Sequence, residues 1–249
     1  MKKAVLYFST CKLDDQYFYK YGATPERIRR YIFTSMFEKD IPKQPISPAE
    51  KECLKRELGI KSAITILTVG RTVPVKGFDV LLKAFQDIGQ KEETSIELEA
   101  CHLYLLGTEC TSEYQKIIRE ENKERLHFID YLPFHELKKY YQASDVFVFP
   151  TRGDTWGLVI NEAMANGLSI ITTNRCVAGD ALVEDGVNGM IVPVDDADAL
   201  CIAMERMVAD TELCEQMGKR NYIKMRNYTL EEMGKIVYGH VADHCAINK

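Results

Sequence analysis

Short apolar runs alternate with amphipathic stretches along most of this chain of 249 residues. The apolar runs predict strands at 64–69, 102–106, 126–129, 146–149, 169–173 and 190–192. Apolar side chains that recur every three or four residues predict helices at 78–88, 112–122, 135–143, 158–166, 197–209, 211–225 and 230–243. Continuous apolar strands are typical of a parallel sheet that is buried on both faces. The alternation therefore predicts a doubly wound α/β domain, in which ligands bind at the carboxyl ends of the strands.

A shorter unit precedes this domain. Strands are predicted at 4–8 and 28–34, with a helix at 13–21 that ends at Gly22. Three prolines between residues 39 and 48 then indicate a linker. A further helix is predicted at 47–57, because Ser47 is a suitable N-cap and a proline follows at the first helical position.

The composition is that of an ordinary globular protein. Hydrophobic residues make up 46% and charged residues 28%, and the net charge of −5 gives no general attraction to nucleic acid. No apolar run approaches the roughly 20 residues of a membrane span, and the apolar stretch at the N-terminus is too short for a signal peptide. The eight cysteines form no C-x-x-C pair, so we expect reduced thiols. These features predict a cytoplasmic protein and leave open a peripheral association with the inner face of the membrane.

His240, His244 and Cys245 are close together near the C-terminus. Their spacing would allow them to share one face of a helix. An exposed terminal helix explains this spacing better than a metal site, which needs more ligands in tetrahedral geometry. We therefore predict no metal site in this chain.

The loop after the strand at 64–69 carries two cations between glycines. Arg71 and Lys76 lie between Gly70 and Gly77, and a helix is predicted to begin directly afterwards. A helix N-terminus offers free N–H groups, and arginine and lysine both suit phosphate oxygens. Two interpretations stay open: a cradle for a diphosphate, or two solvated cations in an ordinary loop.

The loop after the strand at 146–149 carries the only tryptophan of the chain, Trp156. Asp154 and Thr155 precede it and are candidate caps of the next helix. Glu162 lies inside that helix among apolar residues, where a carboxylate is either exposed or has a specific partner. A sugar diol is one suitable partner, since a carboxylate can accept two hydroxyl protons. A helix cap and a surface carboxylate remain the alternatives for Asp154 and Glu162.

A third segment, 179–189, is rich in turn-forming residues. Asp185-Gly186 and Asn188-Gly189 are turn signals directly before the predicted strand at 190–192. We interpret this segment as a structural loop.

These segments together resemble the family 4 retaining glycosyltransferases. The likeness is carried, in order, by residues 69–85, 153–165 and 184–189, and it extends from about 64 to 198. The family has two Rossmann-like domains that face each other across a cleft, and its C-terminal domain binds a nucleotide-sugar donor. The resemblance therefore implies one complete Rossmann-like donor domain in this chain.

The resemblance also implies roles for individual residues. Asp154, where the family usually has a glutamate, and Glu162 would be catalytic, the first near the transferred sugar and the second on the ribose hydroxyls. Arg71 and Lys76 would hold the diphosphate without a metal ion or other cofactor. The other donor-binding positions would be Tyr131 near the base and Thr155, Trp156, Gly157 and Leu158 near the sugar and phosphate.

The chain is shorter than a complete two-domain protein of this family. We interpret 1–41 as a remnant of the acceptor domain, 42–62 as a linker and helix, 63–226 as the donor domain and 227–249 as a C-terminal crossing helix. The expected function is transfer of a sugar, with retention, from a UDP, GDP or ADP sugar to a glycan or lipid-linked acceptor in polysaccharide biosynthesis. The acceptor domain would then come from another chain or a longer product. A binding module without catalysis and a fragment that binds nothing remain the alternatives.

Overall fold

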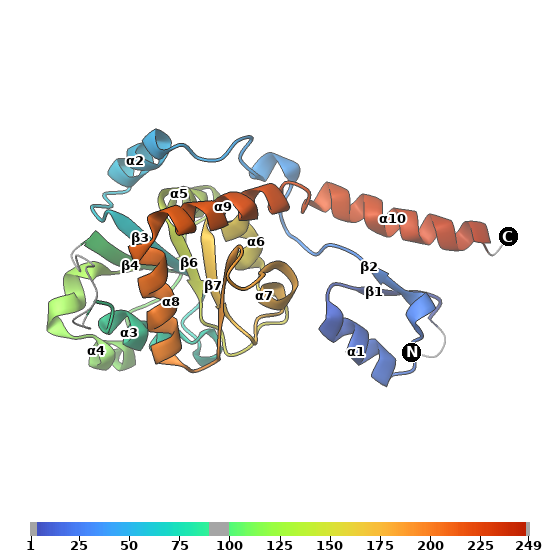
Figure 1. Ribbon diagram of the computed structural model, residues 1–249, viewed down its shortest axis with the longest axis horizontal. Coiled ribbons are helices and arrows are strands. Elements are labelled where there is room, and N and C mark those ends of the chain that lie inside the picture. Colours follow the sequence, from blue (N-terminus) through green and yellow to red (C-terminus); the bar gives the residue numbers. More distant parts are fainter. Residues whose placement is uncertain (1–3, 90–99, 248–249) are drawn as a thin grey trace.

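The computed structural model describes residues 4–89 and 100–247, which form a large α/β domain and a smaller unit at its side (Figure 1). Parallel strands form the large sheet in the order β5-β4-β3-β6-β7-β8. Their bounds are β3 Ile64–Val69, β4 Cys101–Leu106, β5 Leu126–Ile129, β6 Val146–Phe149, β7 Ser169–Thr173 and β8 Gly189–Val192. The predicted doubly wound parallel sheet is thus confirmed.

Helices cover both faces of this sheet (Figure 1). Their bounds are α2 Pro48–Glu57, α3 Phe78–Gln86, α4 Ser112–Ile117, α5 Phe134–Ala143, α6 Leu158–Ala165, α7 Val177–Leu182, α8 Ala197–Ala209 and α9 Thr211–Met225. Successive strand residues point to opposite faces, so each strand contributes side chains to two apolar clusters. Ile66 joins the cluster of α3 and α8, whereas its neighbour Leu67 joins the cluster of α5 and α6.

Helix α4 ends earlier than predicted. It stops at Ile117, and a 3-10 helix at Glu120–Arg125 takes the place of the remaining part of the predicted helix 112–122. The cause is a tertiary contact, because the side-chain oxygen of Gln86 accepts the main-chain N–H of Arg119 at 2.9 Å. This bond turns the backbone out of the helix at a point that local sequence does not mark.

Helix α7 occupies part of the segment 179–189 that was predicted as a loop. Its formation depends on burial, since Ala178 and Leu182 pack fully inside the domain. The turn that follows is held by Asn188, whose amide donates to the carbonyl of Leu182 at 3.0 Å. The loop prediction was thus wrong for residues 179–182, whereas the turn predicted at 185–189 is confirmed.

Helix α2 begins as predicted. The Ser47 hydroxyl accepts the N–H of Glu50 at 3.3 Å, and the Glu50 carboxylate accepts the N–H of Ser47 at 2.9 Å. Lys51 and Lys55 of this helix pair with Asp145, at 2.7 and 3.2 Å. Asp145 directly precedes β6, so these ion pairs fix α2 beside the amino ends of the strands.

The smaller unit contains β1 Tyr7–Ser9, α1 Lys12–Lys20 and β2 Ile28–Arg30, and its two strands pair in parallel. Both strands are shorter than the predicted 4–8 and 28–34. The second one ends at Arg30 because the chain then leaves the sheet as a connector, residues 31–37, that runs towards the large domain.

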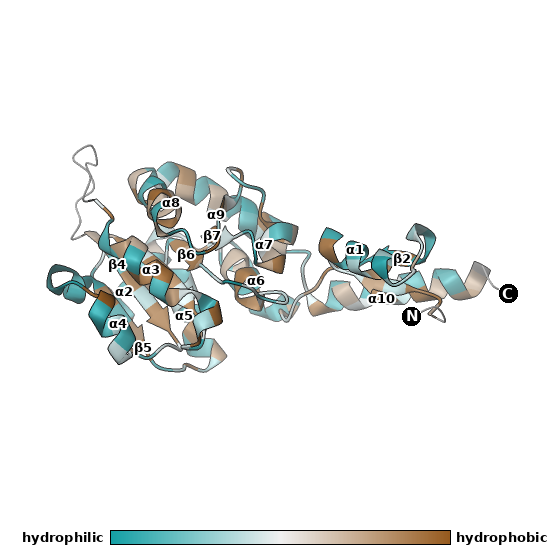
Figure 2. Cartoon of the chain, turned by 90° about the horizontal axis from the view of Figure 1, so that it is seen from below, coloured by the Kyte–Doolittle hydropathy of each residue, from teal (hydrophilic) through white to brown (hydrophobic). Residues whose placement is uncertain are grey.

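The C-terminal helix α10, Leu230–Ile247, lies against the smaller unit (Figure 2). Its His240 ring packs against Phe8 of β1, with the centroids 6.3 Å apart. The adjacent strand residue, Tyr7, packs against Phe18 of α1 at 5.3 Å. Since neighbouring strand residues point to opposite faces, α1 and α10 cover opposite faces of the two-stranded sheet.

The proposed division at 41, 62 and 226 stays a prediction, and residues 1–3 and 248–249 of the terminal segments lie outside the described residues. Among the helices that the structure describes, none combines the length and the apolar character needed to cross a membrane.

Candidate functional site

The loops after β3 and β6 are joined at the carboxyl edge of the sheet. Gly77 has a φ of +70°, and a Cβ at this position would lie 2.1 Å from the carbonyl oxygen of Pro150. The carbonyl of Val75 accepts the N–H of Arg152 at 2.7 Å and the hydroxyl of Thr151 at 3.0 Å. The glycine that was noted in the sequence therefore permits a close backbone approach between the two loops.

Arg152 adds a second set of links between these loops. Its guanidinium donates to both oxygens of Asp79, at 2.9 and 2.8 Å, to Asp195 at 2.6 Å and to the carbonyl of Pro74. Burial acts to raise the pKa of Asp79, but the hydrogen bonds and charge of Arg152 outweigh it, so the pKa is lowered. Arg152 was not among the site residues predicted from the sequence; its position three residues after β6 was the available signal.

Lys76 and Asp154, from the two loops, form an ion pair. The ammonium Nζ lies 2.6 Å from Oδ2 of Asp154 and 5.0 Å from the centroid of the Phe149 ring. Oδ1 of Asp154 accepts the main-chain N–H of Trp156 at 3.2 Å. The structure thus brings together the predicted diphosphate lysine and the predicted catalytic aspartate, and each neutralises the other in this chain.

The N-terminus of α6 differs from its predicted form. Gly157, with a φ of +99°, is the N-cap, and neither Asp154 nor exposed Thr155 caps the helix with its side chain. A Cβ on Gly157 would lie 2.8 Å from Sγ of Cys176, which explains why the backbone needs a glycine here. The prediction of a side-chain cap was wrong, and the first N–H groups of α6, including that of Leu158, are left for another acceptor.

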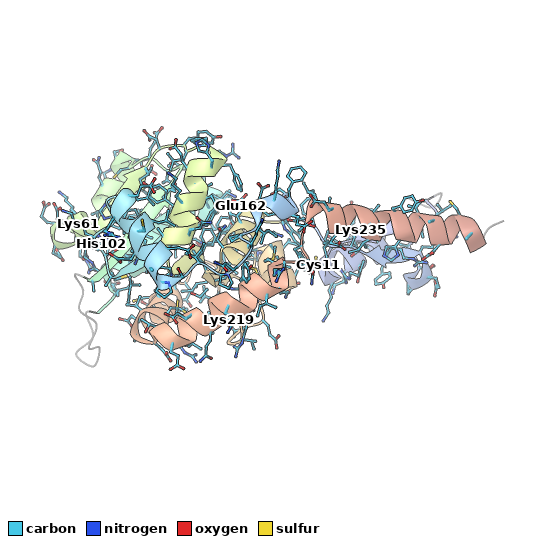
Figure 3. All side chains as sticks on the ribbon, turned by 90° about the horizontal axis from the view of Figure 1, so that it is seen from above. Cys11, Lys61, His102, Glu162, Lys219 and Lys235 are labelled. Atoms are coloured by element: carbon cyan, nitrogen blue, oxygen red, sulfur yellow. The ribbon has the colours of Figure 1, made fainter. Side chains whose placement is uncertain are left out.

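Glu162 is partly buried, four residues inside α6. It lies towards the end of the large domain where the connector leaves (Figure 3). The hydroxyl of Tyr141, a buried residue of α5, donates to its Oε2 at 2.9 Å. Burial raises the pKa of the Glu162 carboxyl, against the lowering effect of this hydrogen bond. Within the described residues no cation pairs with Glu162, so the carboxylate is suited to neutral hydroxyl donors.

Arg71 and Tyr131 form the exposed part of the predicted site. Arg71 follows β3 and makes no side-chain hydrogen bond or ion pair with the residues that the structure describes. Tyr131 follows β5 and is 84% exposed. The main chain directly before Arg71 is nevertheless fixed, since the Thr108 hydroxyl donates to the carbonyl of Gly70 at 2.8 Å.

Two hollows lie elsewhere on the molecule. One, of about 480 Å³, lies between α9 and α10 and is lined by residues such as Arg226 and Lys235. The other, of about 800 Å³, lies at the amino edge of the sheet near Asp145 and Cys214. Neither hollow is lined by a residue of the predicted site, which lies at the carboxyl edge of the large sheet.

The profile of the family "Glycosyl transferases group 1" matches residues 50–224, which include the joined loops, α6 and Glu162. The chain belongs to this family. The resemblance to glycosyltransferases that the sequence motifs indicated is therefore confirmed.

The relatives of this chain include D-inositol 3-phosphate glycosyltransferase of Corynebacterium diphtheriae. The two are 28% identical over 204 residues, which are 80% of this chain and 48% of the relative. The chain spans less than half the length of the first curated relatives that it matches.

Two solved structures share the fold. HepE from Anabaena, in complex with UDP and glucose, has a TM-score of 0.77 at 18% identity, over 96% of this chain and 64% of HepE. The C-terminal domain of LpcC, a glycosyl transferase group 1 family protein from Francisella tularensis, has a TM-score of 0.65 at 18% identity. This likeness covers 79% of this chain and 100% of that domain.

Proposed function

We propose that this chain binds a nucleoside-diphosphate sugar at the carboxyl edge of its large sheet, and that the nucleotide is UDP. The observation that carries the proposal is the combination, at one edge, of two cations, an uncapped helix N-terminus and a carboxylate without a cation. Glycosyltransferase membership and the UDP-bound HepE fold support the choice of ligand.

Each group then has a distinct role. Arg71 and Lys76 hold the diphosphate, together with the first N–H groups of α6. Lys76 exchanges its contact with Asp154 for the phosphate, which leaves the aspartate near the transferred sugar. Glu162 accepts hydrogen bonds from the ribose hydroxyls, and Tyr131 lies beside the base.

The reaction that we propose is transfer of the sugar with retention to a glycan or lipid-linked acceptor. When the glycosyl–phosphate bond breaks, negative charge develops on the leaving diphosphate, and the two cations stabilise it without a metal ion. Chelation by EDTA should then leave UDP binding unchanged, and a loss of binding that Mg²⁺ restores would contradict this part.

The acceptor-binding unit, in this proposal, is a further domain that comes from another chain or from a longer product. The two-stranded sheet supports this, because it has helices on both faces but an open edge. The carbonyl of Ser9 accepts the N–H of Tyr31 at 3.1 Å, so the main-chain groups of Phe8, the preceding residue, point away from β2. An open parallel edge can take up a further strand.

The test is UDP binding, measured by calorimetry and by thermal unfolding with UDP, GDP and ADP as competitors. The variant Arg71→Ala should weaken UDP binding about tenfold or more, because a charge-assisted phosphate contact is lost. Arg56→Ala is the matched control, since Arg56 is also exposed but lies at the end of α2. Absence of UDP binding, or equal binding by both variants, would contradict the proposal.

A second candidate function is nucleotide-sugar binding without catalysis. The observation that favours it is the ion pair of Lys76 with Asp154, because the aspartate that we propose to be catalytic already has a partner within the chain. The two functions differ in one measurement. A binding module retains UDP-glucose but releases no UDP, even when an acceptor-domain chain is supplied, whereas the donor half of a transferase releases UDP in that mixture.

A further inference from the structure

The connector between the two units contacts the candidate site directly. Residues 31–37 have no regular secondary structure. The Phe33 ring packs edge-on against the indole of Trp156, with the centroids 5.3 Å apart and the planes at 78°. Trp156 is only 6% exposed. A segment from the N-terminal part of the chain therefore lies behind the loop that we propose for donor binding.

A fully buried asparagine joins these two parts. Oδ1 of Asn161 accepts the indole N–H of Trp156 at 2.8 Å, and its Nδ2 donates to the carbonyl of Phe33 at 3.1 Å. Asn161 is 0% exposed. A buried amide is costly unless it is hydrogen-bonded, so both bonds favour a single arrangement of the indole and the connector.

The backbone of Trp156 connects this arrangement to the charges of the site. Its N–H donates to Asp154, whose other oxygen pairs with Lys76. Its carbonyl accepts the N–H of Ala178 at 2.7 Å, and Gly157, the next residue, begins α6. A tilt of the indole would therefore alter both the Asp154 contact and the direction of the first N–H groups of α6.

We propose that Asn161 is a positioning residue of the nucleotide-sugar site. It holds Trp156 against the connector and thereby keeps Asp154 and the start of α6 in the geometry that binds the donor. Asn161 does not share the role of its neighbour Glu162, whose carboxylate contacts Tyr141 instead. This inference rests on the proposed function, because it concerns the same site.

The test compares two buried asparagines. Asn161→Leu keeps the approximate size and removes both hydrogen bonds. Asn221→Leu is the control: Asn221 is also 0% exposed, but its amide donates to the carbonyls of Leu168 and Asn188, at 2.7 and 2.8 Å. Both variants should unfold at a lower temperature than the unaltered chain.

Only the site variant should lose affinity for UDP. We expect the Kd measured by calorimetry to rise about fivefold to tenfold in Asn161→Leu and to stay unchanged in Asn221→Leu. Because Trp156 is the only tryptophan, its fluorescence in the absence of UDP gives an independent signal. The emission should shift in the Asn161 variant and not in the control.

The outcomes separate this inference from the proposed function. If the unaltered chain binds UDP and Asn161→Leu binds it equally well, the positioning role is overturned and the proposed function stands. If the unaltered chain binds no UDP, both are overturned. Trp156→Phe keeps an aromatic ring but removes the N–H donor together with part of the ring system, so it tests the same link if Asn161→Leu does not fold.

Discussion

The inner and outer parts of the candidate site differ in what their side chains contact. In the inner part, Lys76, Asp154 and Glu162 already have partners within the protein. In the outer part, Arg71 and Tyr131 are exposed and have no side-chain hydrogen bond or ion pair among the described residues. The inner part is thus arranged before a ligand arrives, whereas the outer part gains contacts only from the ligand. Changes in the inner part should alter stability, and changes in the outer part should alter binding alone.

The largest expected effect is at Gly77, which lets the loops of the inner part approach each other. Gly77→Ala should destabilise the chain by about 3 kcal/mol, because an added Cβ would overlap the carbonyl of Pro150 and the positive φ is strained. The measurement is the free energy of unfolding in urea.

Gly59→Ala is the control for this change. Gly59 has nearly the same φ, +69°, but no atom lies within 4 Å of the added Cβ. Gly59→Ala should lower the free energy of unfolding by about 1 kcal/mol, which is the effect of the positive φ alone. Equal losses in the two variants would mean that the close approach of the loops contributes nothing.

The next effect concerns Glu162. Because burial raises the pKa of this carboxyl in the folded chain, the folded state favours the protonated form. The resulting stabilisation is present below the unfolded pKa and is lost as the pH rises through the folded pKa. At pH 7 the charged Glu162 is therefore unfavourable, and Glu162→Gln should unfold at a higher temperature than the unaltered chain.

The higher unfolding temperature of Glu162→Gln should disappear when the pH falls below the folded pKa of Glu162. UDP affinity should move the other way and weaken about tenfold at pH 7, because the ribose hydroxyls lose a charged acceptor. Glu215→Gln, an exposed change on α9, should alter neither quantity. A Glu162→Gln protein that is less stable at pH 7 would contradict the argument from burial.

The smallest effect is expected in the outer part, at Tyr131. Tyr131→Ala should leave the unfolding temperature unchanged and weaken UDP binding about threefold, through loss of an aromatic contact with the base. Tyr238→Ala is matched in exposure, at 75% against 84%, but lies on α10, so it should leave UDP binding unchanged. A change in stability at Tyr131 would remove the distinction between the two parts.

Much of the fold was predictable because it depends on local patterns. The apolar runs marked all six strands of the large sheet, and Ser47 with Pro48 marked the start of α2. The early end of α4 was not predictable, since the bond from Arg119 goes to Gln86 in another helix. The shortened second strand has a similar cause, because Phe33 packs on the large domain instead of continuing the sheet.

The candidate site divides in the same way. Its residues could be selected from the sequence because they directly follow strands or begin a helix, but their partners could not. Arg152 was missed because its importance depends on Asp79 and Asp195, which lie far from it along the chain. Tyr141 and Asn161 were missed because each looks like an ordinary helix residue until its contact is known.

The sequence by itself determined the alternation of strands and helices and the loops that carry the site, since these follow from the spacing of apolar residues, glycines and prolines. Only the tertiary structure decided that β3 lies between β4 and β6. That order pairs Lys76 with Asp154, and the path of the connector joins Phe33 to Asn161, across 78 and 128 residues of chain. Contacts between segments so far apart leave no periodic signal in the sequence, because they depend on which strands become neighbours in the sheet.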